Sequence, residues 1–446
     1  MDALKIRAMV EKHRDAILAA EQQIWKHPET GFKEWKTSAY LEKIFTDAGY
    51  TLTKAGDIPG FYTDLDTGRP GPKVLILSEL DALDAPNHFQ AVDGCAHACG
   101  HHAQCAAMVG IALALKEPGA LDGLSGSVRL MAVPAEELIE IEYRDSLRKQ
   151  GVIHYLGGKV EYMYRGFMDG VDIAYMFHTS SSENCKFDVH AGNNGCIAKT
   201  VVYEGRASHA GGSPHLGINA LYAASLGLQA ANALRETFRD SDHIRFHPIM
   251  TAGGSTVNII PNRAVLSSYV RGATMGAIAE VNHKINRALA SGALAMGAKV
   301  TIEDRPGYAP LNNSPELIQL SEEVMNEVVG PENVKRTSFW GTGSTDMGDL
   351  STVMPVLHPH ISGASGAAHG DAYYIKDPET ACVASAVGQV AMLCALLEND
   401  AARAGEVIAN FKPLYASKED YFAAVDKFMA DREMIVYGLT EATVQL

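Results

Sequence analysis

The sequence lacks any apolar run long enough to cross a membrane. Its longest uninterrupted stretch, residues 106–115, has ten residues and stops at Lys116, whereas about 20 are needed to span a bilayer. The N-terminus is already charged at Asp2, Lys5 and Arg7, which leaves no apolar stretch for a signal peptide. We therefore expect no membrane segment and a cytoplasmic location.

Basic residues are too few to offset the acidic ones. The 446 residues include 38 Lys and Arg against 53 Asp and Glu, which gives a formal net charge of −15. A field of this sign repels phosphate backbones and anionic lipid surfaces. The composition therefore predicts that neither nucleic acid nor a membrane is a partner.

Cysteines are also scarce, and their number is odd. Seven are present, and three of them lie close together as Cys95, Cys99 and Cys105. In a chain without an export signal, such residues are expected to be reduced thiols, with metal ligation as one use. The sequence therefore does not describe a disulfide scaffold.

Short apolar segments alternate with helical patterns in the first 190 residues. Strands are predicted at 74–77, 127–133 and 172–177, and helices over the first forty residues and at 103–116. This alternation is typical of an α/β sheet. Open sheets of this class bind ligands beyond the carboxyl ends of their strands, so we expect the site there.

The pattern changes near Asn193. From here on it follows the β-α-β-β-α-β order of a ferredoxin-like domain. The predicted elements are a strand at 197–203, a helix at 217–235, strands at 257–260 and 264–271, a helix at 277–296 and a strand at 299–303. The α/β pattern then resumes with a strand at 353–357 and a helix at 378–397. We therefore predict a domain at 192–304 inserted into a discontinuous domain formed by 1–191 and 305–446.

The densest group of chemically active residues lies at 94–102. Three histidines and two cysteines occur within eight residues, and Cys99 and His101 are two apart. In an extended backbone, residues at this spacing project to the same side. Thiolate and imidazole together suit zinc and similar ions. The alternative is a helix N-terminus that is rich in His and Cys.

Two adjacent carboxylates, Glu136 and Glu137, follow the predicted strand that Pro134 ends. Because neighbours on an extended backbone point in different directions, one can bind a metal while the other acts as a general base. The alternative is the solvated start of a helix.

Three further histidines stand in unusual surroundings. His178 directly follows a predicted strand, His369 lies in a Gly/Ala-rich loop, and His209 lies among small residues at 205–212. Small residues allow a ligand or partner to approach closely. Taken singly, a histidine in such a position is more often a structural residue or part of an ordinary turn.

The order of these residues is more informative than any one of them. The series is Asp81, Cys99, His101, Glu136, Glu137, His178, His209, Asn258 and His369. It resembles the co-catalytic metallopeptidase family of aminoacylases, carboxypeptidase G-type enzymes and indole-acetyl-amino-acid hydrolases. The matching stretches are 97–101, 134–137, 207–210, 214–220 and 258–261, and the resemblance extends from about residue 24 to residue 397. The stretch 343–349 looks more like aminobenzoyl-glutamate hydrolase.

The resemblance implies an α/β fold: a mixed-sheet metallopeptidase catalytic domain with helices on both faces, plus an inserted ferredoxin-like lid and dimerisation domain. It implies two divalent metal ions per subunit, zinc or manganese, with the ligands Cys99, His101, Glu137, His178 and His369. Glu136 would be the general base, and Asp81 would also be catalytic. His209, Asn258 and Arg271 would contact the substrate. In the implied homodimer, His209 would reach the neighbouring subunit's metals.

The function expected from this resemblance is metal-dependent hydrolysis of the amide bond of N-acyl amino acids or related conjugates that carry a free carboxylate. The alternatives are a dipeptidase and a non-catalytic metal- or ligand-binding relative. Three departures from the family pattern bear on the choice. His102 and Gln104 stand where relatives have Asp and His, Thr345 stands where they have Glu, and an extra stretch occupies 139–163.

Overall fold

The computed structural model describes residues 3–445 and divides into two compact units. Unit 1 comprises the chain up to Gly192 together with Asn312–Trp340 and Asp349–Lys418. Unit 2 comprises Asn193–Leu311, Gly341–Gly348 and the chain from Glu419 onward. Both units combine helices with mixed or antiparallel sheets, which confirms the expected α/β class.

The central sheet of unit 1 has six strands in the order β1-β2-β6-β3-β7-β19. Strands β6, β3, β7 and β19 are parallel, and β2 is antiparallel to β6. In β3 and β6 every residue but the first is buried, as expected of strands covered on both faces. The bounds are β1 Thr53–Lys54, β2 Phe61–Asp66, β3 Lys73–Glu79, β6 Ser127–Val133, β7 Ile173–Tyr175 and β19 Val356–Leu357.

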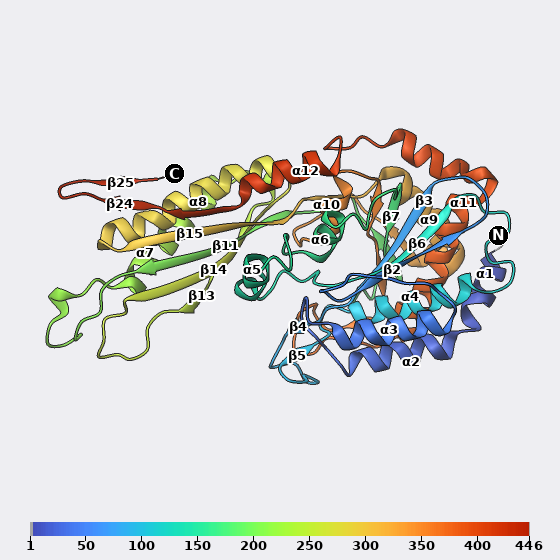
Figure 1. Cartoon of the computed structure of the whole chain (residues 1–446), viewed down its shortest axis with the longest axis horizontal. Coiled ribbons are helices and arrows are strands. Elements are labelled where there is room, and N and C mark those ends of the chain that lie inside the picture. The colour runs from blue at the N-terminus through green and yellow to red at the C-terminus, as the bar shows by residue number, and fades with distance from the viewer. Residues whose placement is uncertain (1–2, 446) are drawn as a thin grey trace. The chain divides into compact units, whose positions relative to one another are not determined.

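Helix α4, His101–Leu115, lies at the centre of this unit. Fourteen of its 15 residues are buried, and a helix that is apolar on all sides belongs in a core. It packs on β3 and on α2 and α3, which lie beside it in Figure 1. The other principal helices of unit 1 are α1 Ala3–Glu11, α2 Arg14–Trp25, α3 Trp35–Asp47, α5 Ile141–Lys149, α6 Gly158–Tyr164, α9 Pro315–Val329 and α11 Ser385–Asn410.

One helical stretch within residues 3–445, Glu379–Asn410, is long and apolar enough to cross a membrane by length and composition alone. This differs from the expectation of no membrane segment, which rested on uninterrupted apolar runs. However, 83% of its most apolar window is buried inside the structure, and the backbone leaves the helical region at Glu398–Ala401. These are the properties of a core helix.

A second, four-stranded sheet of unit 1 has the order β17-β9-β20-β8. Its strands are β17 Val334–Arg336, β9 Phe187–Val189, β20 His360–Ser362 and β8 His178–Ser180. The register places His360 between His178 on β8 and Asp188 on β9. This sheet therefore presents several polar side chains in one row.

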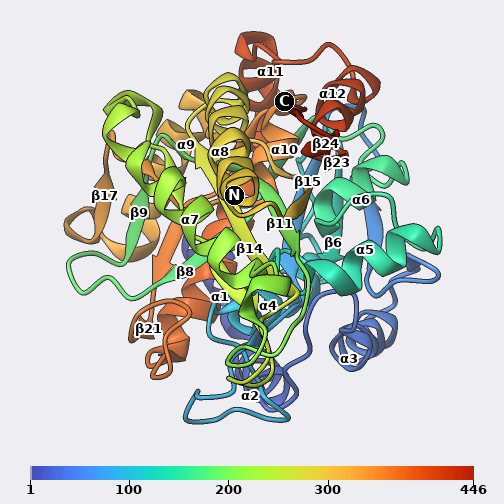
Figure 2. The ribbon, with the colours of Figure 1, turned by 90° about the vertical axis from the view of Figure 1, so that its left-hand side faces the viewer.

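Unit 2 is built on an antiparallel sheet in the order β12-β14-β11-β15-β23, with β13 also paired to β14. Helices α7 and α8 pack on β11 and β14 and lie side by side in Figure 2. The bounds are β11 Gly195–Glu204, α7 Ala220–Ala233, β12 Arg245–Phe246, β13 Ile249–Ala252, β14 Arg263–Gly272, α8 Met275–Met296, β15 Lys299–Tyr308 and β23 Ala430–Glu433.

Two features of unit 2 differ from the sequence analysis. The strand expected at 257–260 is wrong: these residues form a turn whose one bridge joins Ile259 to His209. The sheet also contains two short strands that were not expected, β12 and β13. The first three residues of β13 are exposed, so no buried face marked it. In addition, β23 pairs with β15, which places a C-terminal segment assigned to the catalytic domain in unit 2.

Close packing of α7 on α8 yields a stability prediction. A Cβ added at Gly292 would lie 2.3 Å from the Ala223 carbonyl oxygen and from the Gly227 nitrogen. Gly292→Ala should therefore lower the free energy of unfolding by at least about 2 kcal/mol, as expected of overpacking. Gly276→Ala, on an exposed position of α8 with no atom nearer than 4.0 Å, should raise it by about 0.5 kcal/mol. Urea unfolding compares the two, and equal stability of Gly292→Ala and the unchanged chain would contradict the packing.

Candidate metal centre

Cys99 and His101 lie on either side of a glycine that no other residue could replace without strain. Gly100 has a φ of 91°, and a Cβ there would lie 2.1 Å from the Thr179 hydroxyl oxygen. This turn starts α4 at His101, instead of the extended backbone that the spacing had indicated. Cys99 Sγ lies 3.4 Å from His178 Nε2, so the turn directs the thiol toward His178, the first residue of β8.

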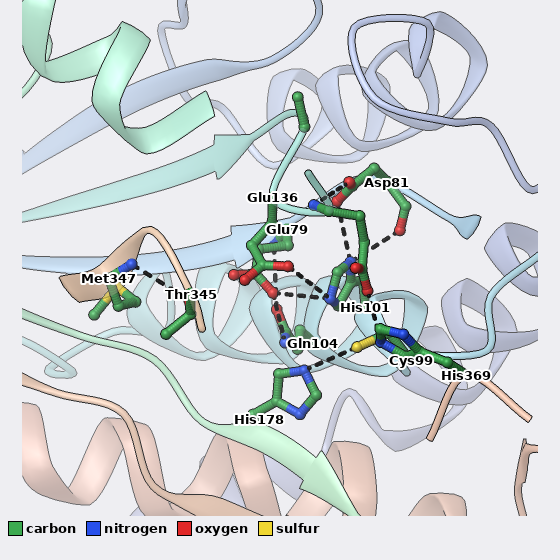
Figure 3. Close-up of polar contacts among 12 residues, drawn as sticks. Glu79, Asp81, Cys99, His101, Gln104, Glu136, His178, Thr345, Met347 and His369 are labelled. Atoms are coloured by element: carbon green, nitrogen blue, oxygen red, sulfur yellow. Dashed lines mark hydrogen bonds and ion pairs between the residues drawn. The ribbon is translucent and has the colours of Figure 1, made fainter. Parts of the chain in front are cut away.

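The five expected ligands come together from separate parts of unit 1. Two groups have ligand atoms that all lie within 4.8 Å of one another, and Cys99 belongs to both. The first adds His101 and His178, and the second adds Glu137 and His369. Figure 3 shows Cys99 between His178 and His369. A shared thiolate between two groups is an arrangement for two neighbouring ions.

The donor set fits divalent transition metals. Two buried atoms, Glu137 Oε1 and His101 Nε2, make no hydrogen bond within the described residues. Each has an ion-pair contact: Glu137 Oε1 lies 3.1 Å from His369 Nε2, and His101 Nε2 lies 3.1 Å from Glu79 Oε2. Buried polar atoms normally have hydrogen-bond partners, and carboxylate, imidazole and thiolate are the usual ligands of zinc.

Asp81 orients both groups without joining either. Its backbone oxygen and Oδ1 lie 2.9 and 3.1 Å from His101 Nδ1, and its Oδ2 accepts a hydrogen bond from the Glu137 nitrogen at 2.8 Å. A carboxylate on one ring nitrogen fixes the tautomer and leaves the other nitrogen for a metal. Asp81 therefore acts through His101 and Glu137.

The turn that carries Glu136 and Glu137 is held from three sides. Ala135 has a φ of 58°, and its nitrogen donates to Glu34 Oε1 at 2.7 Å. Arg144, fully buried, donates to the Ala135 oxygen at 3.2 Å and also to the Glu137 oxygen. Nothing in the local sequence marks Arg144 as buried, so its role could not be predicted from sequence.

Glu79 forms a second polar cluster beside the ligands. Its carboxylate lies 2.5 Å from Lys159 Nζ and 3.1 Å from His101 Nε2, and it accepts a hydrogen bond from Gln104 Nε2 at 3.0 Å. With His101 and Glu136 it forms another group of potential ligands. Glu79 is the last residue of β3, a position that sequence can indicate, whereas nothing in the sequence around Lys159 marks it as buried.

The electrostatics divide the acidic groups into two kinds. Burial, followed by the charges of Glu79 and Glu137, raises the pKa of Glu136 well above its usual value. Burial also opposes ionisation of the Cys99 thiol, but His101 and His178 outweigh it and lower that pKa to about 6. Contacts with Cys99 and Glu137 raise the pKa of His369 to about 11. Without metal, the pKa values of Cys99 and Glu137 thus favour their ionised forms, whereas those of Glu136 and Glu34 are raised toward the acid form.

The departures from the family pattern have local explanations. The His102 ring is fully buried against α2, with Nε2 3.3 Å from Glu21 Oε1 and the ring centroid 4.7 Å from that of Trp25. Gln104 contacts Glu79, as described above. Thr345 belongs to unit 2, where its Oγ1 accepts a hydrogen bond from the Met347 nitrogen at 3.3 Å.

The three expected substrate contacts all lie in unit 2. His209 Nδ1 accepts a hydrogen bond from the Gly212 nitrogen at 2.8 Å, and the Asn258 oxygen accepts one from the next residue, Ala210, at 2.9 Å. Arg271 Nη1 lies 3.4 Å from the Ser344 hydroxyl oxygen. His209 and Asn258 are therefore neighbours, and their role toward a substrate stays a prediction.

Comparison with known proteins gives a consistent result. The family model of peptidase family M20/M25/M40 matches residues 75–399. The mouse (Mus musculus) Xaa-Arg dipeptidase is 28% identical, over 81% of this chain and 80% of that protein. One component of the p-aminobenzoyl-glutamate hydrolase from Escherichia coli K12 is 29% identical, over 66% of this chain and 58% of that protein.

The N-acetyl-L-cysteine deacetylase of Bacillus subtilis is 24% identical, over 67% of this chain and 69% of that protein. Among solved structures, the Bacillus subtilis YXEP protein, a dinuclear metal-binding peptidase of the M20 family, superposes with a TM-score of 0.64 at 18% identity. The match covers 87% of this chain and 99% of YXEP. The fold is therefore shared with a protein that binds two metals.

The geometry predicts different roles for the adjacent carboxylates. Glu137→Gln should retain fewer metal ions per chain than the unchanged chain after dialysis, because it removes a charged ligand from the group with Cys99 and His369. Glu136→Gln should retain metal near the level of the unchanged chain. Elemental analysis of both dialysed variants measures this, and the reverse result would exchange the two assignments.

Proposed function

Since this chain belongs to peptidase family M20/M25/M40 and is a metal-dependent hydrolase, we propose that it cleaves the amide bond of N-acyl amino acids or related amino-acid conjugates. The observation that carries the proposal is Glu136. This carboxylate is buried, lies 3.9 Å from His101 Nε2 and precedes the ligand Glu137. It belongs to neither of the groups that share Cys99, and its pKa is raised. A carboxylate so placed is suited to moving a proton.

In the proposed site, Cys99, His101, His178, Glu137 and His369 would hold the two ions. When bound, these ions supply Lewis acidity that polarises the amide carbonyl and acidifies water. Their identity is proposed to be zinc or manganese, from the mixture of thiolate, imidazole and carboxylate.

The protein's own groups then do the following. A carboxylate oxygen of Glu136 takes a proton from the attacking water and delivers it to the nitrogen of the leaving amine. Asp81 holds the His101 ring in place, and Arg144 fixes the backbone on both sides of Glu136. His209 would stabilise the oxyanion. Arg271 and Asn258 would hold the free carboxylate of the substrate, which suits the fork of a guanidinium.

A second candidate is a dipeptidase. It is favoured by the 28% identity to the Xaa-Arg dipeptidase over most of both chains. The two activities differ at the amino end of the substrate, because a dipeptidase must accept a free α-amine. We also propose a homodimer, on the grounds of the family resemblance, and a cytoplasmic location, where free cysteines such as those of this chain stay reduced.

The decisive experiment assays the purified chain on a panel of N-acyl amino acids and unblocked dipeptides with zinc, manganese or cobalt. We expect N-acyl substrates to be turned over, chelation to abolish the activity and a divalent ion to restore it. Preference for unblocked dipeptides would favour the dipeptidase. Full activity in verified metal-free protein, or no metal-dependent turnover of any substrate, would overturn the proposal.

Replacing the general base separates catalysis from binding. Glu136→Gln keeps the shape but removes the proton acceptor, so kcat should fall by about 10²–10⁴-fold, the usual contribution of general-base catalysis. Glu142→Gln, on an exposed position of α5, is the matched control and should retain normal kcat. Steady-state kinetics at saturating metal measure both, and a loss of less than about tenfold would exclude Glu136 as the base.

The proposed dimer predicts complementation. If His209 serves the neighbouring subunit, a mixed dimer of His209→Ala and Glu136→Gln chains contains one site with both residues intact. Activity should return to a fraction of that of the unchanged protein once the inactive variants exchange subunits. Subunit exchange is followed with a tag that changes the size of one chain or with a fluorescent label. Proven exchange without activity would show that His209 acts within its own chain or not at all.

A further inference from the structure

The four-stranded sheet of unit 1 holds a second cluster of metal-ligand side chains that the proposed reaction does not use. Asp188 on β9 lies opposite His360 on β20 in the strand register. His190 follows Asp188 by two residues, the spacing at which side chains of an extended segment share a face. The ligand atoms of Asp188, His190 and His360 all lie within 4.8 Å of one another.

The distances are close to those of a metal site. In a tetrahedral site with metal–ligand bonds of about 2.0–2.1 Å, two ligand atoms are about 3.3 Å apart and the centroids of two imidazole rings about 5 Å apart. Here the His190 and His360 centroids are 5.1 Å apart, and Asp188 Oδ1 lies 3.8 Å from His360 Nδ1.

The cluster is partly enclosed and its backbone is fixed. His190 is 5% exposed, while the side chains of Asp188 and His360 are 27% and 25% exposed. Asn313 donates to the His190 oxygen at 2.9 Å and accepts from the His358 nitrogen at 2.8 Å. The Asn313 side-chain amide thus links the segments that carry His190 and His358. The partly exposed Asp188 and His360 leave one side of the cluster open to solvent.

A buried imidazole beside the cluster is the second observation. His358 is 3% exposed, and neither of its ring nitrogens has a hydrogen-bond partner among residues 3–445. Its ring centroid lies 5.9 Å from that of His360. A buried imidazole with two unsatisfied nitrogens is unusual in a folded protein, and it marks this region as one built for a polar ligand.

The cluster is separate from the proposed catalytic centre. His178 is the neighbour of His360 in the sheet, but its Nε2 faces Cys99 and its Nδ1 lies 2.8 Å from the Thr179 oxygen. Both of its nitrogens are therefore engaged elsewhere. Lys335 lies opposite Asp188 on β17 but is exposed, so its ammonium can remain in water.

We propose that Asp188, His190 and His360 bind a third divalent transition-metal ion, of the class that two imidazoles and one carboxylate hold, with zinc as the representative. Water completes the coordination at the open side. The ion links β9 to β20, next to the strand that carries His178, and so stiffens the support of the catalytic ligand without taking part in the reaction.

The test counts metal ions in the full-length chain. Protein is equilibrated with zinc at a buffered free concentration, and bound zinc is measured by elemental analysis. The unchanged chain should bind three ions, and His190→Gln and Asp188→Asn should each bind two. His27→Gln, an exposed histidine of unit 1, is the matched control and should bind three. Two ions in the unchanged chain, or three in both cluster variants, would overturn the proposal.

Two further measurements keep the result interpretable. Thermal unfolding in chelator shows whether each variant folds like the unchanged chain, and Asp188→Asn, at a partly exposed position, replaces His190→Gln if that variant does not fold. Glu137→Gln should lose metal from the catalytic centre but keep the third ion. Adding His190→Gln to this variant should then remove the third ion as well. If the double variant retains as much zinc as Glu137→Gln, the ion is not held by this cluster.

Discussion

The buried Arg144 guanidinium is the contact on which the geometry of the site depends. It donates to backbone oxygens on both sides of Glu136 and also to the Leu156 oxygen. Backbone carbonyls are acceptors that cannot rotate away, so three such bonds fix the turn more firmly than side-chain partners would. A base and a ligand on adjacent residues must point in different directions, and this turn, with Ala135 in the left-handed region, separates them.

The same constraint explains the extra stretch between Glu137 and His178. The site gathers Glu34, Glu79, Asp81, Glu136 and Glu137 within one buried region of a chain that is already strongly acidic. Buried carboxylates require nearby cations or hydrogen-bond donors. Arg144 on α5 and Lys159 on α6 supply them from that stretch. We interpret it as the source of compensating positive charge, in addition to any role at the mouth of the site.

Much of the fold followed from local patterns. The strand at 127–133 was predicted with its observed bounds, and α4, β11, β14 and α8 within a few residues, because their apolar runs are long and buried. The run at 257–260 was misread because it is apolar but exposed, with Val257 fully accessible. Apolar character predicts a strand only where a core covers it.

The site was partly predictable for a related reason. Cys99, His101, Glu136 and Glu137 are marked by crowding of reactive residue types within short segments. Lys159, Arg144 and Glu34 have no such mark, since a charged residue far from the motif reveals its burial only through tertiary contacts. His190 and His360 escaped notice likewise, because the strand register that brings them together joins segments 170 residues apart.

The interleaving of the two units along the chain also has a consequence for synthesis. Residues 193–311 form most of unit 2 without interruption, whereas unit 1 still lacks β19, α9 and α11 when that segment leaves the ribosome. Unit 2 can therefore close its core first. Its strand β15, however, stays an open edge until β23 arrives at residues 430–433, and open edges are where chains associate wrongly. Nascent chains that stop before that point therefore expose this strand edge.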